Sequence, residues 1–136
     1  MKSLITIILL SSFLTLQAQD GKVLKILGTA ATWSILNAVG DGLNDSGEKG
    51  WGHAVNALSA AVLIGGTIWS EPQRKDWLRY IVIYAGARYV TFDPAYNLTR
   101  GLPITYNGTT APTDRLVSKV PAGYRTFTRG LAACFT

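Results

Sequence analysis

A polar stretch between two apolar segments carries the side chains of this chain that are best suited to chemistry. Asp41 and Asp45 supply carboxylates, and His53, the only histidine of the sequence, supplies an imidazole. Ionisable side chains are costly to bury in a membrane or a protein core, so they normally have a partner or a function there. The stretch therefore indicates a site, although its residue types alone do not define a reaction.

A second polar cluster follows a third apolar segment. Its arginine, Arg88, is a natural partner for the carboxylates of the first cluster, and Asp93 and Asn97 are expected to cap the turn that follows. The two clusters together predict a polar seam between helices. Its candidate residues are Asn37, Asp41, Asp45, His53, Asn56, Arg88, Asp93 and Asn97.

Helical spacing places several of these residues on common faces. Asn37, Asp41 and Asp45 follow one another at intervals of four residues, and His53 and Asn56 lie three residues apart. Residues three or four positions apart are neighbours on the surface of a helix. The seam is therefore expected to run along one face of each helix.

A metal site is one hypothesis for Asp41, Asp45 and His53. Two carboxylates on one helix and an imidazole on the next supply the mixed ligands that suit zinc, manganese or iron. A hydrolase with a carboxylate or histidine base is a second hypothesis, for which Ser46 and Ser59 are only nominal nucleophiles. The sequence contains neither an HExxH pair nor a GxSxG elbow that would favour either chemistry.

Two non-enzymatic functions fit the same residues. An oligomer of the chain would place the seam along an ion or proton path, a common role of ionisable groups inside membranes. Alternatively, Arg88 pairs with Asp41 or Asp45, and His53 bonds Asn37. The charges then neutralise one another and hold the helices in register. This structural interpretation is the one that we favour from the sequence.

Three helices must position these side chains. The apolar pattern predicts helices over residues 22–45 and 51–69, separated by a turn at Ser46-Gly47. A third helix is expected to begin at Pro72, because proline suits the first turn of a helix, and to end at residues 93–94. The short loops between them favour an antiparallel arrangement.

The second helix has the features of a membrane span. Trp51 and Trp69 bracket it, as interfacial tryptophans do, at a separation of about 27 Å. Ala57, Ala61 and Gly65 form a ladder of small residues that would let another helix approach closely.

Composition favours a membrane protein over a nucleic-acid-binding one. Only 15% of the residues are charged, against about 25% in globular domains, and the mean hydropathy is +0.20. The net charge of +5 is spread along the chain without an Arg- or Lys-rich run, which argues against nucleic acid as a partner. The lone Cys134 cannot form a disulfide within the chain or, without matching ligands, a structural zinc site.

The overall prediction is an all-α protein, a small membrane bundle of three mature helices. Residues 1–18 have the charge and apolar pattern of a signal peptide, residues 19–92 form the helical membrane domain, and residues 93–136 form a Pro- and Gly-rich tail. Within that tail, residues 124–135 suit a short amphipathic helix. The expected location is a bacterial inner membrane, and the expected partners are lipid and membrane proteins, including other copies of this chain. A soluble periplasmic helical domain is the remaining alternative.

Overall fold

The structure is a computed structural model, and it describes residues 21–108, 118–121 and 123–124. The predicted signal peptide, Cys134 and most of the predicted terminal helix lie outside these residues. The described residues form three α-helices and no strand, as the sequence predicts.

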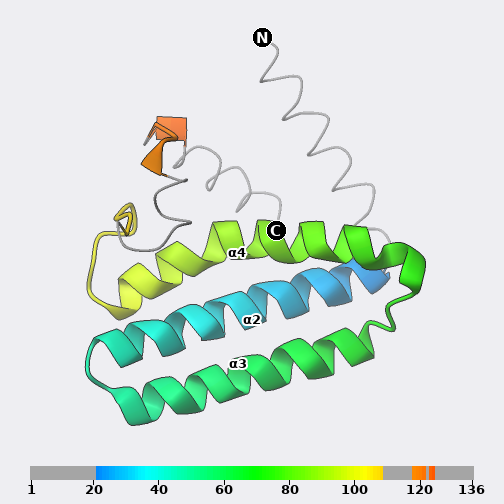
Figure 1. Ribbon diagram of the computed structural model, residues 1–136, viewed down its shortest axis with the longest axis horizontal. Coiled ribbons are helices and arrows are strands. Elements are labelled where there is room, and N and C mark those ends of the chain that lie inside the picture. Colours follow the sequence, from blue (N-terminus) through cyan, green and yellow to red (C-terminus); the bar gives the residue numbers. More distant parts are fainter. Residues whose placement is uncertain (1–20, 109–117, 122, 125–136) are drawn as a thin grey trace.

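The helices are α2 (Gly21–Asp45), α3 (Lys49–Trp69) and α4 (Trp77–Thr99), and the short 3-10 helix η1 (Arg74–Asp76) precedes α4. α2 lies between the other two helices and packs against both (Figure 1). Because α2 has a neighbour on each side, it holds most of the buried residues, whereas only Gly52 and Ser59 are buried on α3.

A tight turn joins α2 to α3 at one end of the bundle. The backbone N–H of Glu48 donates to the carbonyl of Leu43 at 2.9 Å, and that of Ser46 donates to Gly42 at 3.0 Å. Gly47 has a φ of +94°, which glycine adopts without steric cost. The turn that the sequence predicts at Ser46-Gly47 is therefore present.

The connection from α3 to α4 lies at the other end of the bundle (Figure 1). The helix expected to begin at Pro72 instead begins at Trp77, after η1. An ion pair of 3.9 Å between Lys22 and Asp76 joins this connection to the first turn of α2.

α4 continues further than the sequence predicts. It passes through Pro94 and ends at Thr99, although a proline inside a helix removes a backbone hydrogen bond. A tertiary contact holds the last turns in place: the hydroxyl of Tyr96 donates to Asp45 at the end of α2, while its ring stacks on Phe92 one turn earlier in α4. The helix boundary expected at residues 93–94 is therefore wrong, because these contacts outweigh the local effect of proline.

Glycines bring α2 and α3 into close contact near their shared turn. A Cβ atom at Gly52 would lie 2.7 Å from the carbonyl oxygen of Gly40, and one at Gly40 would collide with the Asn56 side chain. The close approach thus depends on Gly40 and Gly52. The ladder of Ala57, Ala61 and Gly65 is exposed and makes no such close approach.

The interior of the bundle is made largely of small and polar residues. Its buried polar residues are Thr29, Ser34, Ser59, Ser70 and Asn97. Val23, Ile26 and Tyr80 are also buried, but many large apolar side chains lie outside: Ile64, Ile68, Leu78, Ile81 and Val82 each expose 59% or more of their surface. This distribution is the opposite of that in most water-soluble domains.

Two helices, α2 and α3, are long and apolar enough to cross a membrane, judged by length and composition alone. Core helices of soluble proteins pass the same test when they are buried. In α2, 39% of the apolar window is buried in the bundle, but in α3 only 11% is. The third predicted span, α4, does not qualify, and it carries Arg79, Arg88 and Asp93.

Candidate functional site

A chain of hydrogen bonds joins four of the predicted seam residues across all three helices. Arg88 of α4 donates from Nη1 to Oδ1 of Asn37 on α2 at 2.9 Å. Nδ2 of Asn37 donates to Oδ1 of Asn56 on α3 at 3.2 Å, and Nδ2 of Asn56 donates to Oδ1 of Asp41 at 2.9 Å. We call these four residues the polar chain.

The polar chain has a direction. Each asparagine accepts through its oxygen and donates through its nitrogen, so the two amide dipoles are aligned between the cation of Arg88 and the anion of Asp41. Aligned hydrogen bonds in a region of low dielectric polarise one another. The two amides therefore couple charges that do not touch directly.

This arrangement differs from the direct ion pair that the sequence suggested. In the described residues Arg88 bonds the amide of Asn37, while the carboxylate of Asp41 bonds Asn56. Asn37 and Asp41 lie four residues apart on one face of α2, so both reach Asn56. Asn37 bonds the amide oxygen of Asn56, and Asp41 bonds its amide nitrogen. Asn37 is also bonded by Asn56 rather than by His53.

Aromatic rings cover the guanidinium of Arg88. Its central carbon lies 4.0 Å from the centre of the Phe92 ring and 5.5 Å from that of Trp33. A planar guanidinium stacks favourably on aromatic faces. Trp33 in turn packs edge-on against Tyr84, with ring centres 5.8 Å apart. These rings position the arginine and shield it from solvent.

A hydroxyl pair extends the polar contacts by one helical turn. Thr91 donates to Ser34 across the interface of α2 and α4 at 2.9 Å, and Ser34 is fully buried. Sequence reasoning missed both residues. Their spacing was an available signal, because Ser34 precedes Asn37 by three positions and Thr91 follows Arg88 by three.

A separate cluster lies near the turn that joins α2 to α3. The hydroxyl of Tyr96 donates to the carboxylate of Asp45 and accepts a hydrogen bond of 3.0 Å from Arg100, which lies 3.7 Å from that carboxylate. Burial raises the pKa of Tyr96 above its ordinary value, and the hydrogen bond to Asp45 adds to the shift, since the neutral phenol is the donor. The hydrogen bond to Tyr96 is also the main reason why the pKa of Arg100 is raised.

The structure does not bring Asp41, Asp45 and His53 together as a group. His53 is exposed on α3, Asp45 bonds Tyr96, and Asp41 bonds Asn56. Within residues 21–108 and the short described pieces beyond them, no group of three or more His, Cys, Asp or Glu side chains is placed to hold a metal ion.

The two remaining candidates lie late in α4. Asn97 is buried and donates to the carbonyls of Ile104 and Tyr106 at 3.1 and 2.8 Å, so it fixes the loop after the helix. These two hydrogen bonds join the end of α4 to the segment that follows it. Asp93 is half-buried in the same part of α4.

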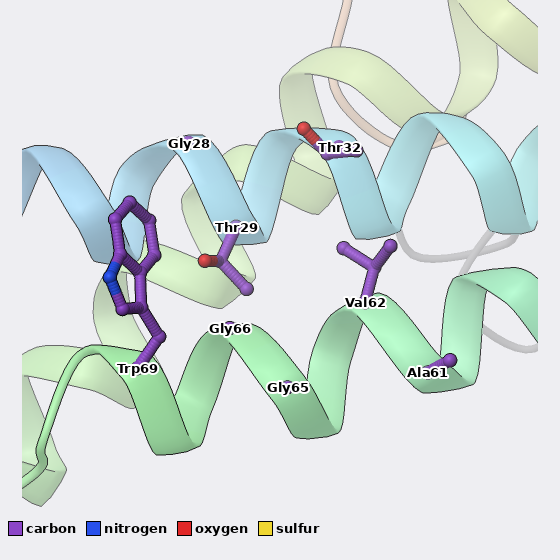
Figure 2. A pocket seen from close by; sticks show the side chains of 8 residues that line it. All are labelled: Gly28, Thr29, Thr32, Ala61, Val62, Gly65, Gly66 and Trp69. Atoms are coloured by element: carbon purple, nitrogen blue, oxygen red, sulfur yellow. The ribbon is translucent and has the colours of Figure 1, made fainter.

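An open groove runs between α2 and α3 (Figure 2). Its volume is about 460 Å³, and Trp69 stands at one end while Thr29 points toward Gly66. None of its lining residues is ionisable: they are Gly28, Thr29, Thr32, Ala61, Val62, Gly65, Gly66 and Trp69. The groove offers van der Waals contact but no acid, base or metal ligand.

Comparisons with protein-family models, with curated proteins and with solved structures return no match.

Proposed function

We propose that this protein is a small, non-enzymatic component of a membrane, whose polar chain holds three antiparallel helices together. The observation that carries the proposal is the distribution of side chains: the interior holds mostly small and polar residues, and many large apolar residues are exposed. Lipid-facing surfaces are apolar, and helices in membranes associate through small residues and interhelical hydrogen bonds.

The exposure of α3 supports this interpretation. Leu58, Ile64 and Ile68 expose 53%, 62% and 70% of their surfaces, so one apolar side of α3 has no cover from the rest of the described bundle. Monomeric soluble proteins rarely leave contiguous apolar patches of more than a few hundred Å² exposed. Lipid chains would cover this side.

The polar chain fits the same environment. An arginine and an aspartate inside a membrane are costly unless they are paired and hydrogen-bonded. Arg88 and Asp41 are linked through two amides that each donate and accept. In the proposed arrangement the apolar parts of α2 and α3 and residues 80–90 of α4 lie in the membrane. Asp45, Tyr96 and Arg100 lie outside it.

We further propose that the location is a bacterial inner membrane, reached through the signal peptide at residues 1–18, and that partners dock on the exposed apolar sides. The role is structural or assembly-related, because the polar chain consists of a cation, two amides and a carboxylate that already satisfy one another.

Alkaline carbonate extraction tests the proposal directly. Membranes from cells that express the full chain are washed with carbonate and centrifuged, and an embedded protein remains in the pellet. A control protein that binds the surface only peripherally should be released under the same conditions. Quantitative release of this chain into the supernatant would contradict membrane embedding and favour the soluble alternative.

A further inference from the structure

One end of the bundle gathers basic residues from three elements. The first turns of α2, the end of α3 and η1 meet there: Lys22 pairs with Asp76 at 3.9 Å, and Nζ of Lys25 lies 4.9 Å from the centre of the Trp69 ring. We call this the basic end, residues 21–25 and 69–80. Its cations are Lys22, Lys25, Arg74, Lys75 and Arg79, and its only carboxylates are Glu71 and Asp76.

The other end of the bundle has the opposite balance. It contains the turn after α2 and the last turns of α4, residues 41–53 and 93–100 (Figure 1). Its carboxylates are Asp41, Asp45, Glu48 and Asp93, against the cations Lys49 and Arg100. The charges at the two ends of the three described helices therefore differ in sign along the direction in which the bundle would cross a bilayer.

An apolar groove between α3 and α4 lies next to the basic end. Its volume is about 380 Å³, and it is lined by Leu63, Thr67, Trp77, Tyr80, Ile81 and Tyr84. We call it the aromatic groove. The hydroxyls of Thr67 and Tyr84 lie 3.2 Å apart and satisfy each other, so the exposed lining is almost entirely apolar.

Arg74 belongs to η1, which directly precedes Trp77, the first α4 residue that lines the aromatic groove. It precedes Trp77 by three residues and Ile81 by seven, so the three share a face of η1 and α4. Arg74 and Lys75 are both exposed, and Trp77 exposes 54% of its surface. The cations Arg74 and Lys75 thus precede the residues that line the aromatic groove.

We propose that Arg74, Lys75 and the aromatic groove bind an anionic phospholipid, with the phosphate at the two cations and an acyl chain along Trp77 and Ile81. This inference rests on the proposed membrane function. Charge complementarity selects the occupant, since cations at one end and apolar walls beyond fit an amphiphile with an anionic head. Basic sites beside membrane helices recognise anionic head groups in this way. A zwitterionic lipid fits the walls but lacks the net charge.

Tryptophan quenching by brominated lipids tests the site. The full chain is reconstituted into vesicles of equal parts phosphatidylglycerol and phosphatidylcholine, with brominated acyl chains on one lipid or the other. Quenching should be stronger when the phosphatidylglycerol is brominated. The excess should disappear in Trp77→Phe, which leaves Trp33, Trp51 and Trp69 as reporters.

Charge variants identify the head-group site. Arg74→Gln should weaken the preference for phosphatidylglycerol about fivefold, because a cation near a membrane surface contributes about 1 kcal/mol. Lys75→Gln provides a second variant of the same kind. Lys49→Gln at the opposite end is the matched control and should leave the preference unchanged.

The outcomes separate the two proposals. Equal quenching by both brominated lipids would leave membrane embedding intact but overturn the anionic site. A preference that survives both Arg74→Gln and Lys75→Gln would also overturn it. Absence of quenching by either lipid would contradict the proposed membrane function, and the lipid site with it.

Discussion

Nη1 of Arg88 donates a hydrogen bond of 2.9 Å to Oδ1 of Asn37, a residue 51 positions earlier on the neighbouring helix. This contact links a cation of α4 to an uncharged amide of α2. The amide of Asn37 in turn donates to Asn56, and the amide of Asn56 donates to Asp41. Breaking any member should therefore affect groups on all three helices.

Replacing Asn56 by leucine removes the central link of the polar chain. Nδ2 of Asn37 and the carboxylate of Asp41 then lose a partner in a half-buried region, which costs about 1–3 kcal/mol for each unsatisfied group. Thermal unfolding in detergent should show a lower midpoint. His53→Ala is the control, because His53 is exposed on the same helix. Equal midpoints for the wild type and Asn56→Leu would refute a stabilising role for the chain.

Substitutions at Arg88 separate its charge from its planar shape. Arg88→Lys keeps the charge but loses the stacking on Phe92 and Trp33, and we expect a loss of about 1 kcal/mol. Arg88→Leu removes both, leaves Asn37 and Asp41 without the cation, and should lower the folding yield markedly. If Arg88→Leu expressed and melted like the wild type, the helix-pairing interpretation would lose its main support.

Alanine substitutions test the close approach of α2 and α3. Gly52→Ala would place a Cβ atom 2.7 Å from the carbonyl of Gly40, and Gly40→Ala would displace the Asn56 side chain. Forced separation of packed helices costs about 1–3 kcal/mol. A Cβ atom at Gly50 meets no atom within 4 Å, so Gly50→Ala is the matched control. It should be neutral or stabilising by up to about 1 kcal/mol. Similar effects at all three sites would argue against a tight crossing.

The stability of the fold should fall at high pH through Tyr96. Its pKa is raised in the folded chain, so its contribution is fully present below its ordinary value of 10.0. The contribution is lost as the pH rises through the higher folded pKa. The difference in unfolding midpoint between wild type and Tyr96→Phe should therefore shrink above that pH. A difference that stays constant across the alkaline range would show that the phenol proton does not stabilise the fold.

Asn97→Ala should release the loop that follows α4. The side chain donates to the carbonyls of Ile104 and Tyr106, and the substitution removes both bonds. We expect faster amide hydrogen exchange over residues 101–108, with little change within α2. Asn107→Ala is a suitable control, since the Asn107 side chain bonds only the neighbouring Gly108. Unchanged exchange in Asn97→Ala would mean that other contacts hold the loop.

Much of the secondary structure could be predicted because it depends on local pattern. The turn at Ser46-Gly47 follows from a glycine at a position of positive φ, and the ends of α2 and α3 follow from the apolar runs around it. The end of α4 could not be predicted locally. Pro94 favours an earlier stop, but the hydrogen bond of Tyr96 to Asp45 on α2 holds the turns that continue to Thr99.

The sequence by itself determined which residues are polar among apolar neighbours, and hence the candidates for the seam. Only the tertiary structure decided which of them meet. His53 and Asn56 lie three residues apart on α3. His53 is nevertheless exposed, whereas Asn56 forms hydrogen bonds with two residues of α2, Asn37 and Asp41. The physical reason is that the rotation of each helix about its axis is set by packing, here by the contact of Gly40 with Asn56 and of Gly52 with α2. Local spacing places residues on a common face, but the neighbouring helices determine which part of that face is buried.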